Sequence, residues 1–287
     1  MEYLMVRTYD HTGYHETRLI LMLVALGFAL YRFYYRSDRR FLIIFASGAA
    51  LMSFSEYMMQ ILALRGTGYY FTLLGMRFSG WVGPAIQGLL DGGACATIAF
   101  WFADLRSAGA ERREWLPYWL VAALLLALSL AAGFLTRDHA ITSSREMFST
   151  PLVFYGTTII FISLFIAWRK DMVTDLTNFF GGLLIFTLLS LEPLHLLGAR
   201  FIGSAGENGI GHASPILDFM LMLLSHVYEN GGARLHYFMF PALLGLIGLR
   251  EKKVSESGEK YSTQHLLDLA QRGWRRRSKP FQKDQSQ

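Results

Sequence analysis

The stretch "RLILMLVALGFALYRFYYRSDRRFLIIFASGAALMSF", residues 18–54, holds two apolar runs that are separated by an arginine-rich connection. Each run approaches the length of about 20 residues that a helix needs to cross the hydrocarbon core of a bilayer. Lipid offers no hydrogen-bond partners to an exposed backbone, so a run that crosses it must be helical. The stretch therefore predicts two membrane-spanning helices joined by a short basic turn.

The same pattern recurs along most of the chain. Charged residues make up 17% of the 287 residues and hydrophobic residues 53%, whereas a soluble domain carries about a quarter charged residues. We expect an all-α fold, a polytopic transmembrane helical bundle over residues 18–250, between an outer lead-in at 1–17 and a basic tail at 251–287. Six spans are expected at about 18–35, 41–64, 81–103, 115–136, 150–169 and 174–198.

Arginine and lysine residues gather in alternate connections, at 32–40, 104–115 and 168–175. Cytoplasmic loops of membrane proteins carry an excess of these residues. The pattern therefore predicts an N-terminus outside and a C-terminus in the cytoplasm. An integral protein of the bacterial inner (plasma) membrane is the expected setting, with the lipid bilayer as its first partner.

Residues 214–250 hold two further apolar pieces, which are separated by "GGAR" at 231–234. Two full crossings would place the basic tail outside, against the charge rule. We therefore expect seven spans, with a re-entrant or outer-surface helix at 214–231 and the last crossing at 234–250; eight spans remain an alternative. The tail, with "RRR" at 275–277, is expected to contact anionic lipid headgroups.

Polar residues occur inside the expected spans in pairs at helical spacing. Side chains three or four positions apart share one face of a helix, and ionisable groups in a membrane normally face the bundle interior. All three pairs lie toward the outer side, so we expect them to outline one polar pocket. The pairs are Glu56 with Gln60, Gln87 with Asp91, and Glu192 with His195.

Histidine and carboxylate side chains together favour a transition metal, for which copper, iron and zinc are the candidates. The expected ligands are Glu192, His195, His236 and Asp91, with His15 as an additional ligand from the N-terminal segment, where His11 also lies. Glu56 and Asp91 are the candidate catalytic carboxylates. Hydrogen bonding between helices would explain the same polar residues without any metal.

Three functions remain open at this point. The first is a metal-dependent membrane enzyme, an oxidoreductase or hydrolase that acts on a lipid or small apolar substrate. The second is a cation or proton transporter or channel, and the third is an accessory subunit that contacts other membrane subunits. No glycine-rich phosphate loop, GxSxG elbow or HExxH motif is present, and we expect no nucleic-acid partner. The glycine pairs at 92–93 and 181–182 are expected to permit close helix contact.

Overall fold

The computed structural model describes residues 3–9, 13–62, 70–79, 82–206 and 209–250, and it is mostly helical. His11 and the basic tail lie outside the described residues. Among these described residues, six helices are long and apolar enough to cross a membrane, and they lie where the six spans are expected. They are α1 (Tyr14–Arg36), α2 (Arg40–Ile61), α3–η1–α4 (Gly83–Gln87, Gly88–Gly93, Ala94–Ser107), α5 (Arg112–Thr136), α6 (Thr150–Arg169) and α7–α8 (Val173–Ser190, Glu192–Leu196).

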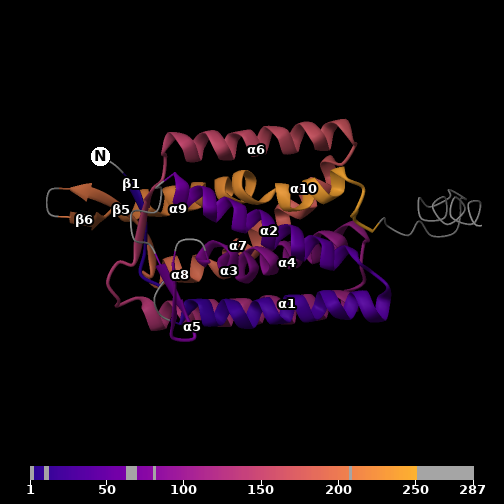
Figure 1. Ribbon diagram of the computed structural model, residues 1–287, viewed down its shortest axis with the longest axis horizontal. Coiled ribbons are helices and arrows are strands. Elements are labelled where there is room, and N and C mark those ends of the chain that lie inside the picture. Colours follow the sequence, from indigo (N-terminus) through magenta and orange to yellow (C-terminus); the bar gives the residue numbers. More distant parts are fainter. Residues whose placement is uncertain (1–2, 10–12, 63–69, 80–81, 207–208, 251–287) are drawn as a thin grey trace, which may run out of the picture. The chain divides into compact units, whose positions relative to one another are not determined.

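The segment after residue 214 differs from the expected division into a surface helix and a crossing. Helices α9 (Pro215–Arg234) and α10 (His236–Leu243) meet at Leu235, whose backbone angles are themselves helical. The two helices follow each other along the bundle (Figure 1). Gly232 does not break the helix; it packs on α6, where an added Cβ would lie 2.6 Å from the Cα of Gly156.

The described residues also form six short strands, which the expectation of an all-α fold did not include. Strands β4 (Ser143–Glu146), β1 (Tyr3–Arg7), β5 (Arg200–Gly206) and β6 (Gly209–His212) form one antiparallel sheet in that order. Strands β2 (Tyr70–Leu73) and β3 (Met76–Ser79) form a hairpin. Met5 and Val6 of β1 are buried, so this strand of the N-terminal lead-in is part of the packed structure.

The large sheet lies at one end of the bundle, with the arginine-rich connections at the other (Figure 1). At the arginine-rich end, buried Asp104 of α4 accepts hydrogen bonds from Arg40 (3.0 Å) and from the side chain of Arg250 (2.7 Å). Burial acts to raise the pKa of nearby Asp38, but hydrogen bonds from Arg40 and Arg32 lower it to about 2. These charged contacts fix the connection between α1 and α2 and the chain that follows α10.

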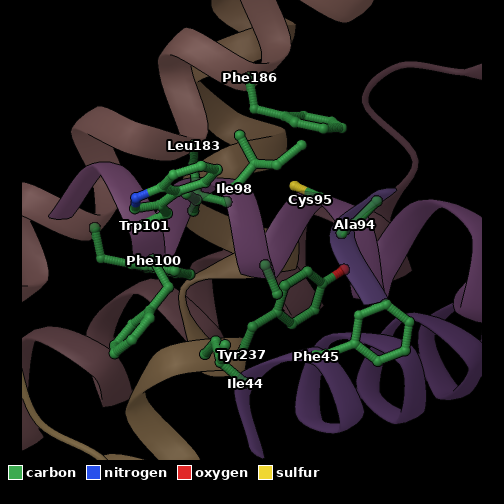
Figure 2. Close-up of a cluster of buried hydrophobic side chains, with 14 of the residues drawn as sticks. Ile44, Phe45, Ala94, Cys95, Ile98, Phe100, Trp101, Leu183, Phe186 and Tyr237 are labelled. Carbon is green, nitrogen blue, oxygen red and sulfur yellow. The ribbon is translucent and has the colours of Figure 1, made fainter. Parts of the chain in front are cut away.

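Large apolar side chains fill the bundle interior between the two ends. Figure 2 shows Ile98, Phe100 and Trp101 of α4 among side chains from α2, α7 and α10. The rings of Phe100 and Phe238 lie 6.2 Å apart, and those of Phe179 and Phe238 are stacked at 5.2 Å. The helix α4 is therefore the centre of the core, with 78% of its candidate span buried.

The expected role of the glycine pairs in close helix contact is confirmed. A Cβ added at Gly92 would lie 2.3 Å from the carbonyl oxygen of Gly48 in α2, and one at Gly182 would lie 2.4 Å from that of Ala99. Real Cβ atoms essentially never approach backbone atoms so closely. Glycine at these positions lets the third span contact α2 on one side and α7 on the other.

Candidate functional site

The third span changes its winding where it reaches the polar end of the bundle. Residues Gly88–Gly93 form a π-helix, a rare element that is frequent at functional sites. Gly88 and Gly92 press against α2, and Asp91 between them reaches toward α1, where its Oδ1 lies 3.4 Å from Nε of Arg18. The glycine-rich sequence therefore permits both the tight helix contact and the placement of this carboxylate.

A cavity of about 50 Å³ opens beside Asp91, at the end of the bundle that carries the sheet. One buried water takes about 10–15 Å³ of such space, so the cavity has room for a few waters or one small polar group. Four arginines and three carboxylates line it, and we call it the arginine cavity. They are Arg7, Arg18, Arg200, Arg234, Glu56, Asp91 and Glu229.

These charges come from elements far apart in the sequence. Arg7 belongs to β1 and Arg200 to β5, and residues 7 and 200 are paired in the sheet. Arg18 lies in the second turn of α1, where its guanidinium covers the ring of Tyr14 at 4.6 Å and donates to the carbonyl of Ser190 at 3.3 Å. The sheet and the helix ends thus deliver charged side chains to the same buried space.

Glu229 of α9 is the most heavily paired carboxylate in the cavity wall. Its Oε1 accepts hydrogen bonds from Nη2 of Arg200 (3.0 Å) and Oγ of Ser225 (3.1 Å), and it also contacts Arg145 of β4. The side chain of Arg200 is only 1% exposed and that of Glu229 14%. The single carboxylate of Glu229 thus pairs with two arginines, Arg200 and Arg145, so this group of three side chains has a net positive charge.

Arg234 has a different environment from the other arginines. Its Nη1 donates to Oγ1 of Thr187 (2.9 Å) and to Oδ1 of Asn230 (2.8 Å), and both acceptors are neutral. Within the described part of the chain, no carboxylate oxygen lies within 4.0 Å of its guanidinium. A fixed positive charge therefore faces the cavity from α9 with only neutral hydrogen-bond partners.

The predicted pair Glu192 and His195 forms a hydrogen-bonded chain with two residues of the following segment. Nδ1 of His195 lies 3.2 Å from Glu192, and its Nε2 lies 3.0 Å from Asp218. The other oxygen of Glu192 lies 2.9 Å from Nε2 of His226. Both ring nitrogens of His195 are therefore engaged with carboxylates, and the chain connects α8 to α9.

The structure brings some of the predicted site residues together and separates others. Glu56, Gln87 and Asp91 all line the arginine cavity, but Glu192 and Gln60 do not. His15 packs on the ring of Phe71 at 4.4 Å. His236 is 3% exposed and surrounded by aromatic rings, including that of Tyr155 at 6.5 Å.

The transition metal stays a prediction. Among the residues that the structure describes, no three His, Cys, Asp or Glu side chains are placed to hold a metal ion together. A metal at His195 would have to replace one of its two carboxylate contacts. Elemental analysis of the purified protein tests the prediction: stoichiometric metal that is lost in His195→Ala would support it, and metal-free wild-type protein would contradict it.

Several cavity residues were not expected from the sequence. The pattern "SHVYENGGAR" at 225–234 places His226, Asn230 and Arg234 four residues apart, which is a readable signal for one polar helix face. The expectation of a surface helix there obscured it. Arg7 and Arg200 offered no such signal, because their proximity depends on strand pairing across almost two hundred residues.

No family model, no curated protein and no solved structure matches the chain.

Proposed function

We propose that the chain is a seven-span protein of the inner membrane with its N-terminus and sheet outside. The six apolar helices support several crossings, and the proposed seventh is the α9–α10 run, which is helical through Leu235. The arginine-rich connections at the end opposite the sheet support this orientation. A reporter fused to the C-terminus should be active only in the cytoplasm; activity only outside would contradict the orientation.

We propose further that the arginine cavity binds a small anionic group, such as the phosphate or carboxylate of a ligand. Arginine remains charged in proteins and binds oxyanions through several N–H donors. Its burial inside a bundle costs free energy unless an anion compensates the charge. Four arginines face three carboxylates in this cavity, and Arg145 adds a further positive charge to Glu229.

The observation that carries this proposal is the environment of Arg234. Arg18 lies beside Asp91, and Arg200 is paired with Glu229, but the hydrogen-bond acceptors of Arg234 are the neutral oxygens of Thr187 and Asn230. Glu229 and Asp91 act on Arg234 over a longer range, so an anion in the cavity would give it a direct negative partner. The cavity volume of about 50 Å³ suits a headgroup-sized anion rather than a whole substrate.

The three functions left open by the sequence do not have equal support from this geometry. An enzyme that acts on a lipid fits an anion site inside the bundle, with Glu56 and Asp91 in the cavity wall as its proposed catalytic carboxylates. The packed aromatic core beyond the cavity favours a closed site over an ion path. The role of an accessory subunit in a larger membrane complex stays a prediction.

Phosphate should raise the unfolding temperature of the purified protein. A ligand that binds only the folded state at 100 times its dissociation constant adds about 2.7 kcal/mol, which corresponds to a shift on the order of 5 °C. Arg234→Gln should lose this shift because it removes the unpaired charge, and Arg234→Lys should keep part of it. Thermal unfolding at increasing inorganic phosphate, with chloride at matched ionic strength, measures the effect.

Arg113→Gln is the matched control, because Arg113 is 83% exposed in the described structure and lies far from the cavity lining. It should respond to phosphate like the wild type. An equal phosphate shift in Arg234→Gln and in the wild type would contradict the proposal, since the effect would then arise from other basic residues.

A further inference from the structure

A second, mostly apolar hollow lies next to the arginine cavity, between α6 and α9. Its volume is about 190 Å³, and we call it the α6–α9 groove. Val153 and Tyr155 of α6 line one side, and Leu224 and Tyr228 of α9 line the other. Only 17% of the candidate span of α6 is buried, and α6 lies at the edge of the bundle (Figure 1), so the groove faces the surroundings of the bundle.

The walls of the groove are fixed by specific contacts. The hydroxyl of Tyr228 donates to the carbonyl oxygens of Leu152 (3.1 Å) and Val153 (2.7 Å) in the first turns of α6. A Cβ added at Gly232 of α9 would lie 2.6 Å from the Cα of Gly156 in α6, and one at Gly156 would lie 2.3 Å from the hydroxyl of Tyr228. These contacting residues also line the groove, so they hold its two walls together.

One ion pair belongs to both hollows. Glu229 lines the arginine cavity and the groove, and its partner Arg145 lines the groove. The side chain of Arg145 is 13% exposed. The groove thus has an apolar length between two helices and a charged end, and this end is also a wall of the arginine cavity.

We propose that the α6–α9 groove holds the hydrocarbon chain of a membrane amphiphile whose anionic headgroup is bound at the arginine cavity. The inference rests on the proposed anion site and adds the class of its ligand. Two features of the groove argue for an anionic lipid with an alkyl chain. Its apolar side chains suit an alkyl chain that enters from the bilayer, and its charged end, the Arg145–Glu229 pair, adjoins the arginine cavity, where four arginines face three carboxylates.

Because the groove adjoins the arginine cavity, a ligand that fills both would have a reason to leave the bulk lipid. An alkyl chain gains little by moving from lipid into an equally apolar groove. The headgroup gains more, because it exchanges the interface for a cavity lined by four arginines and three carboxylates, in which Arg234 donates hydrogen bonds to neutral acceptors. Affinity should therefore depend on the anionic head, and the position of the chain should depend on the groove.

Photolabelling in vesicles of uncharged phosphatidylcholine tests this arrangement. The probe is a long-chain alkyl phosphate with a diazirine at the end of its chain, and the alcohol of the same chain is the uncharged comparison. The phosphate probe should label peptides of α6 and α9 in a saturable manner and be displaced by unlabelled alkyl phosphate. The alcohol should label all lipid-facing helices without saturation.

Leu224→Trp is expected to fill the groove, because Leu224 lines it and is half-exposed. It should reduce saturable labelling by about tenfold, equivalent to 1.4 kcal/mol, and leave the phosphate-induced rise in unfolding temperature intact. Leu223→Trp is the matched control: Leu223 is equally exposed on the same helix but does not line the groove. Labelling of this variant should equal that of the wild type.

The possible failures can be told apart. If phosphate stabilises the protein through Arg234 but chain labelling is unsaturable, or survives in Leu224→Trp, the groove assignment is wrong and the anion site stands. If the alcohol labels the groove as strongly as the phosphate probe and inorganic phosphate has no effect on stability, both proposals are wrong.

Discussion

Gly92→Val should abolish the accumulation of folded protein. Its Cβ would lie 2.3 Å from the carbonyl oxygen of Gly48 and 2.4 Å from Cβ of Met52, so α2 and the π-helix would have to separate. Overpacking of this kind costs about 3 kcal/mol or more when backbone atoms block relaxation. The separation would also displace Asp91 from the arginine cavity. Yield of monodisperse protein in detergent and its unfolding temperature measure the effect.

Gly27→Ala is the matched control for that substitution. Gly27 lies in the middle of α1, and a Cβ added there has no neighbour within 4 Å among the described atoms. Alanine in a helix is favoured over glycine by about 0.5–1 kcal/mol, so this variant should be as stable as the wild type or slightly more stable. A similar loss of folded protein in both variants would show that helix contact is not the cause.

Glu229→Gln should destabilise the protein by about 3–5 kcal/mol, the usual cost of removing one partner from a buried ion pair. The substitution leaves Arg200 and Arg145 without the carboxylate that they share. Glu146→Gln, at an exposed position on β4, should have almost no effect. Chemical or thermal unfolding of the three proteins gives the difference in free energy.

The same variant also reports on the anion site. Because Glu229→Gln removes a negative charge from the cavity wall, it should be stabilised by phosphate more strongly than the wild type. A variant that is destabilised but insensitive to phosphate would mean that Glu229 has only a structural role and that its arginines do not bind anions.

The six apolar spans could be predicted because length and hydropathy are local properties of the sequence. The helical spacing of Gln87 and Asp91 likewise placed both side chains at one cavity. The strands could not be predicted in this way. Strand β1 has five residues, and the strands that pair with it begin at Ser143 and Arg200. Its conformation therefore depends on contacts with distant parts of the chain, which a local sequence pattern cannot predict.

The arginines of the cavity were harder to predict from the sequence than Gln87 and Asp91. The sequence emphasised His195 and His236, yet His195 is engaged by Glu192 and Asp218, and His236 lies among aromatic rings. Arginine-rich connections predict topology from the sequence alone. The burial of other arginines in the cavity wall depends on tertiary contacts, such as that of Arg234 with Thr187 on α7.

Equilibrium binding of radiolabelled phosphate to the purified protein in detergent tests the central claim most directly. If the arginine cavity is an anion site, the wild type and Arg113→Gln should each bind phosphate saturably with one site per chain, and Arg234→Gln should lose that site. Phosphate binding that does not saturate in the wild type, or that remains unchanged in Arg234→Gln, would contradict the account.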